Sequence, residues 1–177
     1  MSSQDYPVSN QTRNEIWQGY LDAERLNRYY QYLADKHRKI DQGIKFTIAF
    51  AAVGGVTRLI AALPDEWGWI SDVSSVVILF VVIVELVFDF RSKSSVLTRT
   101  SENLQHITRD WQMLWNQVDR QDATDGVLLN KMDDLLKKSI ESTKPVGQIG
   151  LSINSRINQK SWEEAIEVIT AQYATRS

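Results

Sequence analysis

The 177-residue chain has no cysteine, only two histidines and three prolines, and nearly equal numbers of basic and acidic side chains, at 20 and 22. The absence of cysteine excludes a disulfide scaffold, a thiolate metal site and a cysteine nucleophile. Neither histidine has a partner at metal-binding spacing, and the chain contains no nucleophile elbow and no P-loop. A net charge of -2 argues against nucleic-acid binding driven by bulk charge. We therefore expect no enzyme, no metal site and no cofactor.

Apolar residues are concentrated in two runs of twenty residues, 44–63 and 69–88. A helix of that length spans roughly 30 Å, which is the thickness of the hydrocarbon core of a bilayer. The link between the runs contains Pro64, two acids and Trp67, and it has no Lys or Arg. We therefore predict an antiparallel transmembrane hairpin. The alternative is a very apolar helical hairpin inside a soluble bundle.

The residues that flank the predicted hairpin are basic on both sides. Six Lys or Arg residues occur between positions 25 and 45, and four occur between positions 91 and 109. The positive-inside rule places such flanks in the cytoplasm and the uncharged or acidic link outside. The sequence thus predicts a multi-pass membrane protein with both termini in the cytoplasm.

Polar side chains occur in or directly after both predicted spans: Arg58, Ser71, Asp72, Ser74, Glu85 and Asp89. A charge inside a membrane is costly, and it is usually paired or faces water. One interpretation is that these residues line a pore built from several subunits. The other is that they form ion pairs that lock the hairpin. Asp72 would then pair with Arg58, and Glu85 would pair with Lys45.

Helical spacing of apolar residues predicts long helices on both sides of the hairpin. The first covers residues 10–42, and its partner-facing stripe is Leu26, Tyr30, Leu33, His37, Ile40 and Ile44. The stripe of the second is Leu97, Thr100, Leu104, Ile107, Trp111, Leu114 and Val118. We expect these stripes to assemble subunits. The second helix either continues from Ser71 to Arg120 or begins anew between Asp89 and Ser95, where serines can cap it.

The C-terminal part is predicted as a loop over 121–126, a helix over 127–139, a connector over 142–150 and a last helix from Ser161. Glu164 follows Ser161 by three residues, which predicts a capping box. The expected apolar faces are Leu128, Met132, Leu135 and Leu136 on the first helix, and Trp162, Ala165, Ile166, Ile169 and Tyr173 on the second. Basic candidates for binding an anionic nucleotide are Lys137, Lys138, Lys144, Arg156 and Lys160; the alternative is a solvated charged surface.

The predicted fold is therefore all-α: a two-helix transmembrane hairpin with long cytoplasmic helices that form a helical-bundle oligomer. An N-terminal cytoplasmic helix occupies 1–43, and the hairpin occupies 44–90. A long cytoplasmic helix occupies 91–120, and a helical C-terminal region, the candidate signal-sensing part, occupies 121–177. Because one hairpin cannot enclose a channel, a pore would require a homo-oligomer, a tetramer or larger, in the lipid bilayer.

The segment RLNRYYQYLADKHRK, the hairpin after it and the segment LQHITRDWQMLW resemble the SLATT-type two-transmembrane effectors of bacterial anti-phage systems. The resemblance covers Ile16 to Val118 and is architectural. It implies a pore in the bacterial inner membrane that opens on a nucleotide or oligonucleotide signal from a partner nucleotidyltransferase. Opening would depolarise the infected cell and abort phage replication. The alternative function is a membrane-anchored helical adaptor that recruits a cytoplasmic partner.

Overall fold

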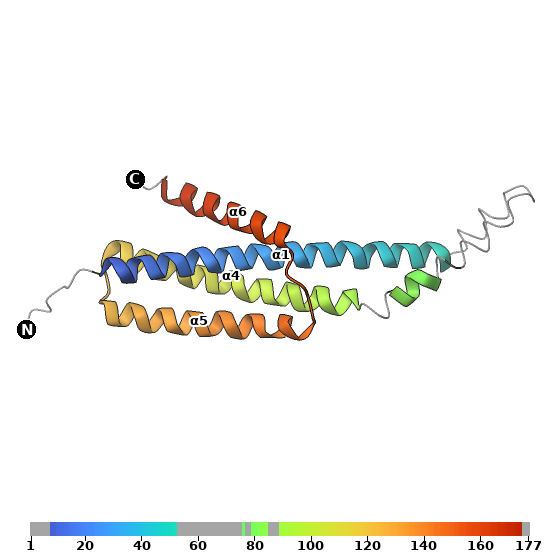
Figure 1. Cartoon of the computed structure of the whole chain (residues 1–177), viewed down its shortest axis with the longest axis horizontal. Coiled ribbons are helices and arrows are strands. Elements are labelled where there is room, and N and C mark those ends of the chain that lie inside the picture. The colour runs from blue at the N-terminus through green and yellow to red at the C-terminus, as the bar shows by residue number, and fades with distance from the viewer. Residues whose placement is uncertain (1–7, 53–75, 77–78, 85–88, 175–177) are drawn as a thin grey trace, which may run out of the picture. The chain divides into compact units, whose positions relative to one another are not determined.

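The structure is a computed structural model that describes residues 8–52, 76, 79–84 and 89–174 (Figure 1). Its four long helices are α1 (Asn10–Ala52), α4 (Phe90–Arg120), α5 (Asp125–Gln148) and α6 (Ser155–Ala174). The described residues contain no β-strand. The prediction of an all-α chain is therefore confirmed.

The predicted location, a multi-pass protein of the bacterial inner membrane with both termini in the cytoplasm, is contradicted. Within the described ranges, no helix combines the length and the apolar content that crossing a bilayer requires. The longest, α1, has 43 residues, but charged side chains occur along it from Arg13 to Lys45, whereas a span needs about 20 mostly apolar residues in succession. Most of the predicted hairpin lies outside the described residues.

The chain divides into two compact units, one made of residues 1–34 and 96–177 and the other of residues 35–95. In the second unit, Lys45 forms an ion pair with Asp41 one helical turn earlier. The predicted partner of Lys45, Glu85, lies outside the described residues. Also in this unit, the ring of His37 lies 5.7 Å from that of Phe90. Burial lowers the pKa of His37, with smaller contributions from two nearby lysines.

Helix α4 is the centre of the first unit, and all seven residues of its predicted stripe are buried. Five of them, Leu104, Ile107, Trp111, Leu114 and Val118, join a core cluster that also contains residues of α1, α5 and α6. Trp111 is 1% exposed and passes directly over Gly19 of α1, where there is no room for a side chain. The stripe expected to assemble subunits is thus covered within one chain.

Helix α4 begins at Phe90 and does not continue from Ser71. Asp89 has a φ of 44°, a left-handed conformation that aspartate tolerates better than most residues. Its carboxylate accepts a hydrogen bond from the backbone N–H of Ser92 at 3.2 Å. A new start near Asp89, the second of the two predicted alternatives, is therefore the one observed, but the cap is Asp89 and not a serine.

The predicted stripe of α1 is confirmed only in its first half, where Leu26 and Tyr30 pack against the core and Leu33 is buried. Among its six residues only Leu33 is fully buried, and the main buried stripe begins earlier in the chain: Thr12, Ile16, Tyr20, Ala23, Asn27 and Ala34. Two of these are polar, so a search for apolar periodicity passes over them. Asn27 can be buried because its side-chain carbonyl accepts hydrogen bonds from Gln31 at 3.2 Å and from Ser101 at 3.4 Å.

Helix α5 is longer than predicted, because it continues through the expected connector to Gln148 with Pro145 inside it. Proline removes one backbone donor and usually ends a helix. Here the next residue, Val146, is buried in a cluster with Tyr29 and Leu97, and that packing favours the helical path. The helix ends where Gly150 adopts a φ of 63°, a conformation that glycine takes without strain.

Helix α6 begins at Ser155, six residues before the predicted start, so the predicted capping box is wrong. The capping residue is Asn154, whose side chain accepts a hydrogen bond from the N–H of Ile157 at 3.1 Å. Ser161 lies inside the helix and donates to the carbonyl of Ile157. The carboxylate of Glu164 instead contacts Tyr32 and Arg28 of α1. Within the first unit, Figure 1 shows α5 and α6 on opposite sides of the α1 and α4 helices.

Polar contacts hold α6 against α1. The hydroxyl of Tyr32 donates to the carboxylate of Glu164 at 2.6 Å, and Arg28 pairs with the same carboxylate at 3.3 Å. The N–H of Asn154 donates to the hydroxyl of Tyr29 at 3.1 Å. The contacts from Tyr32 and Arg28 lower the pKa of Glu164, and the hydrogen bond from Tyr32 contributes most. The predicted apolar face of α6 is only partly used: Ala165 and Ile169 are buried and Tyr173 is partly buried, whereas Trp162 and Ile166 are exposed.

Candidate functional site

Two adjoining cavities between α4 and α5, with volumes of about 410 and 450 Å³, share the lining residues Asp110 and Lys138. They therefore form one continuous depression, which we call the α4–α5 groove. From α4 it is lined by Asn103, His106, Ile107, Asp110, Met113, Leu114 and Gln117. From α5 it is lined by Asn130, Lys131, Asp134, Leu135, Lys138, Glu141 and Ser142.

The groove follows directly from the helical spacing of α4. Its outer lining residues on α4 each precede a buried stripe residue: Asp110 precedes Trp111, and Met113 precedes Leu114. Since neighbouring residues of a helix point about 100° apart, these side chains form a second row beside the buried one. The antiparallel α5 supplies the opposite wall.

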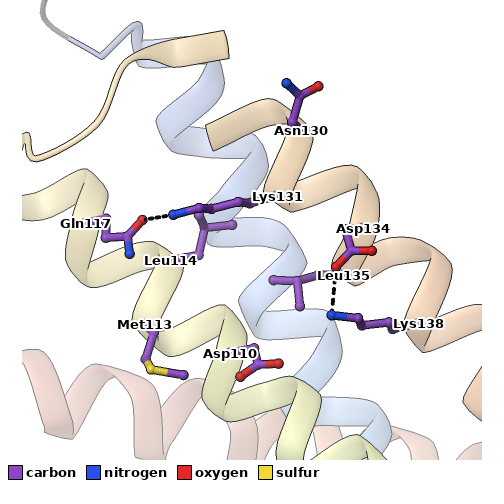
Figure 2. A pocket seen from close by; sticks show the side chains of 9 residues that line it. All are labelled: Asp110, Met113, Leu114, Gln117, Asn130, Lys131, Asp134, Leu135 and Lys138. Carbon is purple, nitrogen blue, oxygen red and sulfur yellow. Dashed lines mark hydrogen bonds and ion pairs between the residues drawn. The ribbon is translucent and has the colours of Figure 1, made fainter. Parts of the chain in front are cut away.

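The floor of the groove is apolar. Leu114 and Leu135 are 3% and 5% exposed, and they lie between the two helices (Figure 2). Met113 stands beside them with 56% of its surface exposed. Exposing so large an apolar side chain to water is unfavourable in an isolated helix bundle. Methionine is also flexible enough to pack against partners of different shapes.

The rims of the groove carry charges of both signs. Lys138 pairs with Asp134 at 2.7 Å, and Lys131 donates to the side-chain carbonyl of Gln117 at 2.9 Å, as the dashed lines in Figure 2 show. The hydrogen bond from Lys138 to Asp134 raises the pKa of Lys138, and the charge of the nearby Asp110 adds to this.

Two carboxylates of the groove lack a direct polar contact with the described residues, although Asp110 lies near enough to Lys138 to raise its pKa. Among the described residues, Asp110 and Glu141 make no hydrogen bond and no ion pair. Asp110 is partly buried, and a carboxylate in that position is more stable when a cation approaches it. The groove therefore has Lys131 near one end, Asp110 at its middle and Glu141 toward the other end. Its floor is Leu114 and Leu135, and Met113 is the exposed apolar residue beside that floor.

The predicted nucleotide-binding residues are distributed over two helices. Of the five, Lys138 lines the groove, and Lys137 and Lys144 are exposed elsewhere on α5. Arg156 is exposed at the start of α6, and Lys160 lies 4.4 Å from the ring of Tyr32. Nothing in these contacts tests nucleotide binding, which stays a prediction.

The predicted intramembrane polar residues lie almost entirely outside the described residues, namely Arg58, Ser71, Asp72, Ser74 and Glu85. The exception, Asp89, precedes α4 and caps it. The residues that shape the groove on α4, above all Asp110 and Met113, were not predicted. The available signal was Met113, an apolar residue directly beside the buried stripe.

Comparison with known proteins identifies no relative: the chain matches no protein-family model, no curated protein and no solved structure. The resemblance to SLATT-type effectors therefore stays a prediction, and the geometry of the groove is the evidence on which a function can be proposed.

Proposed function

We propose that the chain is a helical adaptor that binds an amphipathic helix of a partner protein in the α4–α5 groove. The groove extends from Asn103 to Gln117 on α4. At about 1.5 Å per residue this is roughly 21 Å, or about four helical turns. A depression of this length between two antiparallel helices suits a third helix, which recognises it through side chains spaced three and four residues apart.

The observation that carries the proposal is the exposed Met113 above a buried leucine floor. A partner helix that places a leucine or phenylalanine over Met113 would remove apolar surface from water on both molecules. Burying one such side chain contributes about 1.5–3 kcal/mol. Binding energy is usually concentrated in a few central apolar contacts of this kind.

The charges of the groove define the partner further. A Lys or Arg near the middle of the partner helix would meet Asp110, and an acid near one end would meet Lys131. Such pairs at the edge of an interface mainly set orientation and specificity. Lys138 and Asp134 already pair with each other within α5, so neither needs a charged residue on the partner.

The test uses labelled peptides. A library of amphipathic helices of about 18 residues, each with one leucine stripe, is selected for binding to the full chain. Affinity of the best peptide is then measured by fluorescence anisotropy. Met113→Glu should weaken binding at least about tenfold, which corresponds to about 1.4 kcal/mol. The matched control is Ile153→Glu, because Ile153 is 82% exposed and lies outside the groove.

A charge exchange tests the chemistry of the partner. Asp110→Lys should weaken a peptide that carries a lysine opposite this position, and replacing that lysine by aspartate should restore binding. Equal losses for Met113→Glu and Ile153→Glu, or no rescue by the exchanged peptide, would show that the groove is not the binding site.

The proposed adaptor recruits a partner, as the sequence predicted. The predicted membrane anchor is not part of the proposal, because no described helix is suited to cross a bilayer. The nucleotide-gated pore stays a prediction, since its proposed lining residues other than Asp89 lie outside the described part of the chain.

A further inference from the structure

Helix α5 carries an apolar stripe that contributes to neither the core nor the groove. Leu129, Leu136 and Ile140 are 36%, 43% and 69% exposed. They are separated by seven and four residues, which places them on one face of a helix with 3.6 residues per turn. The buried residues Leu128 and Leu135 each precede a residue of this stripe and therefore point about 100° away from it.

Two opposite charges lie along one edge of the stripe. Asp133 and Lys137 are both exposed, and neither forms an ion pair or hydrogen bond with the described residues. Asp134 and Lys138 have the same spacing one position further along the chain, and they pair with each other at 2.7 Å. Asp133 and Lys137 are thus free to pair with charges on another molecule.

We infer that this face of α5 pairs with the same face of a second copy of the chain, with the two helices antiparallel. A two-fold axis near position 135 sets residues whose numbers sum to 270 at the same height. Leu136 then lies within about 3 Å of the height of Leu136 of the second copy, and Leu129 lies within about 1.5 Å of the height of Ile140. Asp133 faces Lys137 of the second copy, and the same pair forms again on the other side of the axis.

The pattern identifies a second copy as the occupant because it is complementary to itself. In a two-fold interface the same surface of each molecule meets itself. Reversing the direction of α5 brings an acid onto a base and one aliphatic side chain onto another. The opposite edge of the stripe consists of Asp125, Met132, Ser139 and Thr143. Its one charged residue, Asp125, lies at the height of Pro145 of the second copy, so no like charges oppose each other there. An unrelated partner would not require this symmetry.

Pairing through this face leaves the α4–α5 groove open. The groove residues Lys131 and Lys138 lie five residues before Leu136 and two after it, and at about 100° per residue they point to the far side of α5. A dimer could therefore still bind one partner helix per copy. Self-association and groove binding can accordingly be tested separately.

The test is the solution mass of the full chain by sedimentation equilibrium or light scattering. We expect twice the chain mass of 20.3 kDa for the unmodified protein. Asp133→Lys and Lys137→Asp should each yield monomers, because each places like charges together twice. An equal mixture of these two single variants should restore the dimer, since one copy then supplies two cations and the other two anions. The double exchange in one chain should restore it as well.

Asp134→Lys is the matched control, because Asp134 neighbours Asp133 but faces the groove, and it should leave the dimer intact. Met113→Glu should also leave the mass unchanged, which separates this inference from the proposed function. All substituted side chains are exposed, so helix content by circular dichroism should not change. A monomeric unmodified chain at every concentration would overturn the inference. So would a dimer whose mass is indifferent to Asp133→Lys and Lys137→Asp.

Discussion

Gly19→Ala tests the close approach of α1 and α4 at Trp111. A Cβ placed at Gly19 would meet three atoms of the Trp111 ring, the farthest of them at 2.9 Å. Trp111 is 1% exposed, so its ring cannot move away without displacing the core. Such overpacking costs about 1–3 kcal/mol. Alanine also favours the helix over glycine by about 1 kcal/mol, which offsets part of the loss.

Gly43→Ala is the matched control, since Gly43 lies in the same helix and no described atom comes within 4 Å of a Cβ built there. Gly43→Ala should raise the free energy of unfolding through the better helix propensity of alanine alone. The difference in unfolding free energy between the two variants isolates the packing term, and we expect about 1–3 kcal/mol. Urea unfolding followed by circular dichroism measures it. An equal rise in the free energy of unfolding for both variants would refute the close approach of α1 and α4 at Trp111.

Three further changes have expected directions. Gln121→Gly should raise the unfolding free energy by about 1–2 kcal/mol, because Gln121 follows α4 with a φ of 55° and a side chain is strained there; a loss would contradict the left-handed end of the helix. Asn154→Ala should lower the unfolding free energy by about 1 kcal/mol through loss of the α6 cap. Asn154→Asp should largely retain the cap and therefore the stability. Tyr32→Phe removes the hydrogen bond that most lowers the pKa of Glu164. A carboxylate with a lowered pKa stabilises the folded state above its ordinary pKa of 4.5, and this contribution is lost as pH falls through the lowered value. Tyr32→Phe should therefore reduce stability near neutral pH and make urea midpoints less sensitive to acidification; an unchanged acid dependence would contradict the role given to Tyr32.

How much of the fold the sequence predicts depends on how each helix is buried. All seven stripe residues of α4 could be predicted, because this helix has an apolar row with polar residues around it. The stripe of α1 could not, because the polar residues Thr12 and Asn27 are buried in it, and Asn27 accepts a hydrogen bond from Ser101, which is distant in sequence. Polar residues satisfied in this way do not appear in an apolar pattern.

The boundaries of the C-terminal helices were wrong for tertiary reasons. Pro145 predicts a break, but burial of Val146 against residues far away in sequence favours continued helix. Ser161 and Glu164 have the spacing of a capping box, yet Glu164 instead binds Tyr32 of α1. The α4–α5 groove depends on the placement of two helices, and one-dimensional spacing could indicate only the exposed row that contains Met113.

The most direct test of helix binding in the groove is a methyl spectrum of the chain labelled at methionine. The chain has three methionines, of which Met113 lines the groove and Met132 packs against the core. Addition of the selected helical peptide should shift the Met113 methyl signal and leave that of Met132 nearly unchanged. A peptide that binds tightly without moving the Met113 signal would contradict the proposed function.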